Sequence, residues 1–429
     1  MQSVRFFLTD SLRIYPVFIL IYVVGGLACT LMTGKKLKQL SFTIINITGC
    51  LYLSSGILYQ NLKGDLERNK LIFLILAVFT IYLLFVCFEY YLIFLFAERK
   101  DKSSWLAFLA PIFSLIAVKY LPGDYNPLGL FLSGSQIVPG FGVFVGISYM
   151  AFRLSYLVLE IKNETVKRPG FLEFFCFAFF VPTFIVGPIS PYGVFARNLY
   201  APDRAITPVA RSVLRIIIGA VKYQFLANLF NQLSYEGLLL DGNPHTFIDL
   251  CVAAVAYYFY LYLNFSGFCD MGIGAAGLMG ISVKENFDNP FAARNVKDFW
   301  NRWHITLSEY MRTVVFTPLS KIFVYLLGTK RINHAIALAI FLVFLLIGVW
   351  HGVGWNYFFF GLFHAVGVVV THYYTIILKK VLADRFPDYG KSVIIRSIAT
   401  AITFIYITAS FFLFANSLDG IKKIIEVIQ

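Results

Sequence analysis

Charged side chains are scarce in this sequence. Asp, Glu, Lys and Arg together make up 14% of the 429 residues, whereas a soluble domain carries roughly 25%. Apolar residues make up 59%, and continuous apolar runs approach the roughly 20 residues that a helix needs to cross a bilayer. This composition excludes an ordinary soluble domain. It indicates a polytopic membrane protein whose long unbroken runs favour helices over membrane strands.

Motifs for several common chemistries are also missing. The six cysteines stand singly, and no CxxC spacing indicates a zinc site or a redox pair. The sequence contains neither a GxSxG nucleophile elbow nor a P-loop. We therefore expect no metal and no bound cofactor, so any catalysis has to rest on other side chains.

The few charges that are present are unbalanced, with a formal net charge of +13. Lys and Arg of membrane proteins collect in cytoplasmic loops, and here they are spread over many short loops. This distribution argues against nucleic acid as a partner. It predicts a basic cytoplasmic face that would attract anionic lipid or an acidic carrier protein.

The apolar segments predict an all-α protein with about ten to twelve membrane crossings, one or two re-entrant pieces and an interfacial helix. The predicted spans cover residues 15–32, 42–59, 71–97, 105–120, 141–159, 171–188, 212–230, 246–263, 335–350 and 393–414. A Gly-, Pro- and Ser-rich stretch at 122–140 is expected to form a loop or a re-entrant piece, and residues 352–378 are expected to form a bent or broken hairpin. No repeat, soluble domain or linker is visible, so we expect one integral-membrane domain over residues 1–429.

One stretch, residues 294–354, is chemically the most unusual. It begins RNVKDFWNRWHITLSEYMRT, and residues 296–314 carry apolar side chains at the i, i+3, i+4 spacing of one helix face. This pattern predicts a single amphipathic helix that lies in the interface plane. His304 falls on its apolar face. A histidine that packs in the interface without chemistry is the alternative interpretation.

A second histidine, His351, ends the apolar run AIALAIFLVFLLIGVWHGVG. An ionisable group at membrane depth is costly and indicates a functional site by default, although a packing histidine bonded to a carbonyl is the alternative. Neutral imidazole, with an ordinary pKa of about 6.5, is the standard general base. A set of His304, His351 and a carboxylate matches no known metal-ligand spacing. A base without a metal suits the deprotonation of an alcohol that attacks an activated acyl group.

Other polar residues lie in predicted membrane segments. Asp270, in NFSGFCDMGIG, could orient a base, bind substrate or pair with an arginine such as Arg153, and the pairing is favoured. Asn264 and Ser266 are weaker candidates in the same stretch. His364 lies on an apolar helix face, where we expect its ring to be satisfied within the core.

Several blocks of this sequence are similar to one known family. They are GISYMAFRLSYLVLEIKN, FFVPTFIVGPISPYGVF, NFSGFCDMGIGAAGLMGISVKENFDNPFAARN, DFWNRWHITLSEYMR and VWHGVGWNYFFFGLFHA, in this order. Together they resemble the membrane-bound O-acyltransferase (MBOAT) family, and most of all its bacterial branch with alginate O-acetyltransferase and the teichoic-acid D-alanyl transfer protein. The resemblance covers roughly residues 140–365. After the NRWH block this chain reads MRTVVFTPLSK, where acetyl-transferring relatives usually read RDYxYIPLGG, so donor and acceptor stay open.

The resemblance implies a ring of helices around a thin floor, with a funnel on each side and a central tunnel, in a core of about residues 140–372. His351 would be the catalytic base in that tunnel. His304 would be the second important histidine, near the donor entrance. The candidate substrate-binding residues are Trp300, Asn301, Trp303 and Trp350 from the two histidine blocks, together with Asp270, Asn264, Ser266 and Arg153.

The resemblance also implies a function. A multi-pass enzyme of the bacterial inner membrane would move an acyl group, acetyl or D-alanyl in type, from a cytoplasmic thioester to a hydroxyl of an extracytoplasmic polymer, polysaccharide or relay protein. The donor would be acyl-CoA or an acyl carrier protein with a phosphopantetheine arm. A transporter or flippase for an envelope precursor is an alternative, because buried polar groups and broken helices suit it equally. A membrane partner that has lost catalysis is another.

Overall fold

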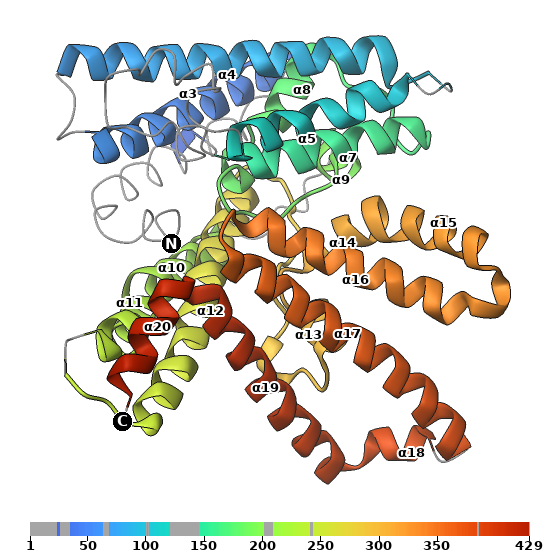
Figure 1. Cartoon of the computed structure of the whole chain (residues 1–429). Coiled ribbons are helices and arrows are strands. Elements are labelled where there is room, and N and C mark those ends of the chain that lie inside the picture. The colour runs from blue at the N-terminus through green and yellow to red at the C-terminus, as the bar shows by residue number, and fades with distance from the viewer. Residues whose placement is uncertain are drawn as a thin grey trace. The chain divides into compact units, whose positions relative to one another are not determined.

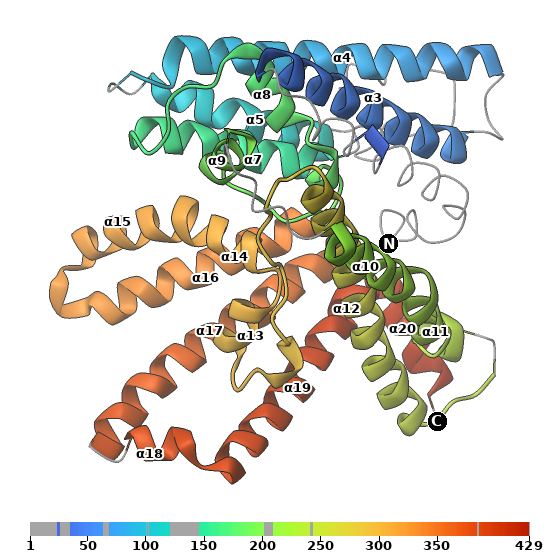
Figure 2. The same ribbon diagram turned by 180° about the vertical axis from the view of Figure 1, so that it is seen from behind.

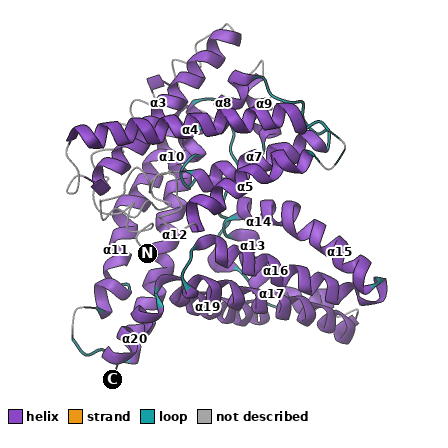
Figure 3. Cartoon of the chain, turned by 45° about the horizontal axis from the view of Figure 1, so that its top comes forward, coloured by secondary structure: helices purple, strands orange, loops and turns teal. Residues whose placement is uncertain are grey.

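The computed structural model of the chain describes residues 24–25, 35–62, 68–99, 101, 103–120, 146–200, 209–240, 243–383 and 386–428. All named elements in these ranges are helices (Figure 3). Within these ranges, six helical stretches, some of them made of several consecutive elements, are long and apolar enough to cross a membrane, and three shorter apolar helices accompany them. The prediction of a multi-pass helical protein is confirmed. The predicted span at 15–32 and the re-entrant stretch at 122–140 lie outside the described residues.

The chain divides into two compact units, residues 1–219 with 268–284 and residues 220–267 with 285–429. The helices of the first unit are α3 (Lys35–Leu62), α4 (Arg68–Phe96), α5 (Ser104–Tyr120), α7 (Ile147–Lys162), α8 (Phe171–Ala178), η4 (Val181–Thr183), α9 (Tyr192–Tyr200) and most of α10 (Val209–Ala220). Phenylalanines dominate its core, including the fully buried Phe174, Phe177 and Phe184. The span predicted at residues 171–188 is not one continuous helix, because α8 ends at Ala178 and only a short 3₁₀ turn that contains Pro182 follows.

The second unit carries both histidine blocks (Figure 1). Its helices are η5 (Val221–Leu226), α11 (Ala227–Gln232), η6 (Tyr235–Leu239), the first part of α12 (Phe247–Leu278), η7 (Pro290–Ala292), α13 (Val296–Arg302), α14 (Ile305–Met311), η8 (Arg312–Phe316), α15 (Thr317–Leu327), η9 (Thr329–Arg331), α16 (Ile332–His351), α17 (Trp355–Leu382), α18 (Phe386–Lys391), α19 (Val393–Ala415) and α20 (Leu418–Val427). The span predicted at 246–263 thus continues to Leu278 as one helix.

Helices α16 and α17 form a hairpin and run side by side in Figures 1 and 2. Two glycines let their backbones touch: a Cβ atom added at Gly348 would lie 2.7 Å from the Cα atom of Gly361. The prediction of a bent or broken hairpin over residues 352–378 was wrong, since α17 is a single helix of 28 residues. Gly361 inside it serves close packing between helices, so it does not mark a break.

Candidate active site

The prediction of a single helix over residues 296–314 was wrong, because the backbone breaks at His304. Helix α13 ends at Arg302, Trp303 is extended, and His304 adopts the left-handed conformation with φ +46° before α14 begins. Positive φ is uncommon outside glycine, and such torsions cluster at functional sites. The break therefore marks His304 as a position that the fold holds in a specific conformation.

A segment upstream of α13 stabilises this break. The backbone N–H of Asp288 donates to the carbonyl of Arg302 at 2.9 Å, and the N–H of Ile305 donates to the carbonyl of Asn286 at 3.0 Å. These bonds take the place of helical hydrogen bonds that the break removes, so the backbone groups stay satisfied. Residues 286–288 thus fix where His304 lies.

Asn286 also reaches the imidazole with its side chain. Its Oδ1 atom lies 3.3 Å from Nδ1 of His304, and it accepts hydrogen bonds from the backbone N–H of Thr306 at 3.1 Å and from the Thr306 hydroxyl at 2.8 Å. Asn286 is only 1% exposed. It was absent from the predicted site, and the polar run ENFDNP within a resembling block is the only sequence signal that we see for it.

The ring of His304 lies among aromatic side chains. It meets Phe265 edge to face with ring centroids 4.8 Å apart, and the ring of Trp350 lies 6.4 Å away. His304 is 3% exposed, and this burial lowers its pKa to about 3. The imidazole is therefore neutral at physiological pH, because burial penalises its charged form.

His351 is the last residue of α16 and is partly exposed. Its ring lies 4.7 Å from Trp350 and meets Phe414 of α19 edge to face at 5.1 Å. Trp350 therefore has the imidazole of His351 on one side and that of His304 within 6.4 Å. The structure brings the two predicted histidines together around one indole.

A third histidine joins the same part of the second unit. The indole N–H of Trp300 donates to Nδ1 of His364 at 3.1 Å, and His364 is fully buried. The prediction that His364 is satisfied within the core is confirmed at this nitrogen. The bond links α13, which leads to His304, with α17, which follows His351, so His364 belongs to the site's frame.

The other two candidates of the NRWH block, Trp303 and Asn301, lie in different environments. Trp303 is buried and stacks on Phe299 with ring centroids 5.4 Å apart. Asn301 is exposed and accepts a hydrogen bond from the guanidinium of Arg312 at 3.1 Å. The structure therefore places Trp303 in the buried aromatic cluster and Asn301 on the outer face of α13.

Three buried polar groups lie close to His304, either in sequence or in space, and have no hydrogen-bond partner in the described part of the chain. They are the hydroxyls of Ser266 and Ser308 and the amide nitrogen of Asn264. Asn264 and Ser266 flank Phe265, whose ring contacts His304, and the N–H of Ser308 donates to the His304 carbonyl. Buried polar atoms without partners are rare and need an explanation.

Asp270 and Arg153 belong to the first unit. The guanidinium of Arg215 donates to Oδ1 of Asp270 at 3.0 and 3.1 Å. The prediction of an arginine partner is thus confirmed in kind, with Arg215 in that role. Arg153 is almost fully buried and lies over the ring of Phe177, 4.5 Å from its centroid, where the ring face attracts the cation.

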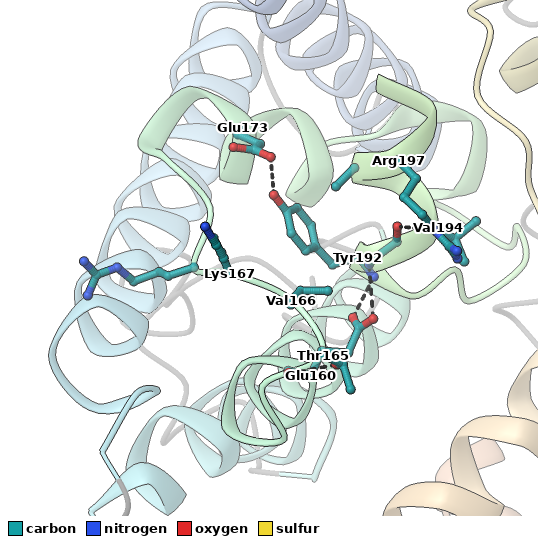
Figure 4. A pocket seen from close by; sticks show the side chains of 11 residues that line it. Glu160, Thr165, Val166, Lys167, Glu173, Tyr192, Val194 and Arg197 are labelled. Carbon is teal, nitrogen blue, oxygen red and sulfur yellow. Dashed lines mark hydrogen bonds between the residues drawn. The ribbon is translucent and has the colours of Figure 1, made fainter. Parts of the chain in front are cut away.

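The first unit also holds a pocket of about 640 Å³ between the end of α7 and the start of α9 (Figure 4). Both oxygens of Glu160 accept backbone N–H groups, from Tyr192 at 2.8 Å and Gly193 at 3.1 Å. The Tyr192 hydroxyl donates to Glu173. The Glu160 carboxylate thus satisfies backbone N–H groups at the start of α9, and none of the predicted site residues lines this pocket.

Comparison with known proteins identifies the family of this chain. The profile of the membrane-bound O-acyltransferase family matches residues 114–414. A teichoic acid D-alanyltransferase of Bacillus subtilis is 28% identical over 403 residues, which cover 88% of this chain and 97% of that protein. A teichoic acid D-alanyltransferase of Streptococcus thermophilus is 28% identical over 339 residues, or 76% and 78%. A peptidoglycan O-acetyltransferase of Helicobacter pylori is 31% identical over 279 residues, or 63% and 49%.

The match spans well over half of the chain, so the protein belongs to the membrane-bound O-acyltransferase family. It is a multi-pass membrane enzyme of the O-acyltransferase type. The predicted resemblance is confirmed.

Proposed function

We propose that this protein moves a D-alanyl-type acyl group from a cytoplasmic thioester to a hydroxyl of a cell-envelope polymer or relay protein outside the membrane. It would lie in the inner membrane of a bacterium, with about ten to twelve crossings around a central tunnel. The D-alanyl type is favoured over acetyl because the D-alanyltransferase of Bacillus subtilis aligns along nearly its whole length, whereas about half of the O-acetyltransferase aligns.

The observation that carries this proposal is the position of Trp350. It brings His304 and His351, from two separate sequence blocks, to one aromatic cluster. The orphaned hydroxyl of Ser266 lies next in sequence to Phe265, which contacts the His304 ring. We assign such buried polar atoms to contacts with a polar substrate, since a bound ligand would satisfy them.

The chemistry requires one base and two aligned substrates. His351 would take the proton from the acceptor hydroxyl while that oxygen attacks the thioester carbonyl carbon. A carbon–oxygen bond forms, the carbon–sulfur bond breaks, and the thiolate receives the proton from the imidazolium and leaves as a thiol. Such base catalysis is worth about 10²–10⁴-fold, and holding both substrates in a dry tunnel supplies much of the rest.

The donor would be a thioester on a phosphopantetheine arm, carried by an acyl carrier protein or by coenzyme A. A carrier protein is favoured because the net charge of +13 and basic cytoplasmic loops would attract an acidic partner. The arm would enter from the cytoplasm, and the acceptor hydroxyl from the opposite side.

The test measures alkali-labile D-alanyl and acetyl esters on the envelope of a deletion strain complemented with variants. We expect His351→Ala to lower D-alanyl ester formation at least about 100-fold, because the base is lost, and His304→Asn to lower it as well. His334→Ala is the matched control, since His334 is an exposed histidine bonded to Tyr373.

Unchanged ester content in both active-site variants, at equal protein levels, would contradict the enzyme mechanism. Loss of envelope precursor export with ester chemistry intact would favour the transporter alternative. Loss of acetyl in place of D-alanyl ester would keep the mechanism and overturn the acyl assignment.

A further inference from the structure

The cluster around Asn286 constrains the proton of His304. We infer that Asn286 is a positioning residue that holds neutral His304 in the tautomer with its proton on Nδ1, so that Nε2 presents a lone pair to a donor group of the substrate. This inference deepens the proposed function and rests on it for the identity of the substrate. The tautomer itself follows from contacts within the second unit.

The first step assigns the amide of Asn286. Amide oxygen and nitrogen are distinguished by their hydrogen-bond partners. The backbone N–H of Thr306 can only donate, and it points at this atom from 3.1 Å. The atom is therefore the oxygen, and it acts as an acceptor toward every neighbour.

The second step follows from that oxygen. Nδ1 of His304 lies 3.3 Å from it. With a proton on Nδ1, the imidazole donates a hydrogen bond to Oδ1 of Asn286. In the other neutral tautomer, the lone pairs of Nδ1 and Oδ1 would face and repel each other in a buried site. The side chains against the ring include Phe265, Trp350 and Asn286, and none of these three carries a charge. The neutral ring is thus held with Nδ1 protonated.

The third step concerns what His304 can do. In this tautomer Nε2 accepts a hydrogen bond and cannot donate one. His304 therefore does not stabilise an oxyanion. The substrate group that it recognises is an O–H or N–H donor, such as the acceptor hydroxyl or an amide of the donor's arm. Its left-handed backbone and the bonds of residues 286–288 to the break keep the ring at this position.

The test observes the tautomer directly by nitrogen NMR. The full-length protein, labelled with ¹⁵N-histidine and reconstituted in lipid vesicles, is compared with His304→Asn to assign the signals. We expect Nδ1 protonated and Nε2 unprotonated between pH 5 and 8. In Asn286→Leu the ratio of this tautomer to the other should fall about two- to tenfold, the range of one net hydrogen bond.

A conservative variant provides a pH readout that a purely structural role would not move. In Asn286→Asp a carboxylate faces Nδ1–H and favours the imidazolium, so the pKa of His304 rises from about 3. Because the neutral ring is required, the acid limb of D-alanyl transfer should move to higher pH. Thr306→Val is the control, since it removes one donor to Asn286 and should leave the tautomer unchanged.

A proton on Nε2 of His304 in the wild type, or an unchanged tautomer in folded Asn286→Leu, would overturn this inference. If Asn286→Leu does not fold, an unshifted acid limb in Asn286→Asp would overturn it equally. Failure of all acyl transfer with the expected NMR spectrum would instead refute the proposed function and leave the tautomer assignment standing.

Discussion

The bond between Trp300 and His364 is a single polar contact within an aromatic cluster. Phe299 and Phe360 flank the His364 ring with centroids 6.1 and 4.5 Å away, so little except the indole N–H can satisfy Nδ1. In a neutral ring that accepts at Nδ1, the proton lies on Nε2. This arrangement is the reverse of the one inferred for His304. Two histidines of one site are thus held in opposite tautomers by their neighbours.

We predict that His364→Phe destabilises the protein more than its loss of size explains. It leaves the buried indole N–H of Trp300 without an acceptor, which costs about 1–3 kcal/mol. His364→Asn keeps an acceptor close to the position of Nδ1 and should recover part of the loss. The measurement is the apparent melting temperature in detergent, with Trp300→Phe/His364→Phe as the pair that removes donor and acceptor together. Equal melting temperatures for His364→Phe and wild type would contradict the prediction.

The candidate residues predicted from the sequence stand in local sequence patterns, whereas those that were not predicted depend on contacts between distant segments. His304, His351 and the tryptophans before them stand in distinctive local patterns, so the sequence predicts them. Asn286 acts through a pairing between residues 286–288 and the break after Arg302, and helical periodicity over residues 296–314 carries no trace of that pairing. Arg215 as partner of Asp270 is likewise a contact between helices, which neither residue type nor spacing determines.

Helical elements position His351 through backbone contact. Gly348 of α16 and Gly361 of α17 face each other, and a Cβ atom added at Gly361 would lie 2.7 Å from the carbonyl oxygen of Phe344. Small residues at such a crossing allow backbones in membranes to approach closely. His351 lies less than one helical turn beyond Gly348, so this crossing sets the place of its ring.

Enlarging that crossing should separate the hairpin. We predict that Gly361→Val lowers the apparent melting temperature, because overpacking typically costs 1–3 kcal/mol, and lowers D-alanyl transfer more than tenfold, because His351 is displaced. Gly170→Ala is the matched control, since a Cβ atom there meets nothing within 4 Å. Wild-type activity in Gly361→Val would show that the crossing does not position His351.

At the scale of the whole molecule, charge gives the second unit an orientation. Helices α16, α17 and α19 pack in sequence as antiparallel neighbours (Figure 1). The start of α16, the end of α17 and the start of α19 are basic, through Lys330, Arg331, Lys379, Lys380, Lys391 and Arg396. The opposite ends hold His351 and Phe414, whose rings lie 5.1 Å apart. Since basic residues of membrane proteins collect in the cytoplasm, we predict that the His351 end faces outward.

Cysteine labelling tests this orientation. In a variant without native cysteines, Val353→Cys, at a position 72% exposed beside His351, should react with a membrane-impermeant maleimide in intact cells. Thr329→Cys, in the basic turn before α16, should react only after permeabilisation. The reverse pattern would contradict the orientation and would move the base to the side of the donor.

The left-handed backbone at His304 also offers a way to distinguish relatives that retain the reaction from those that have lost it. Such torsions cost a non-glycine residue roughly 1–3 kcal/mol, and glycine adopts them without steric penalty. In a lineage that no longer needs an imidazole at this position, mutation to glycine would remove this backbone cost. Glycine at the aligned position would therefore identify descendants that have lost the reaction. A retained histidine would identify those in which selection for the imidazole outweighs the cost of the backbone conformation.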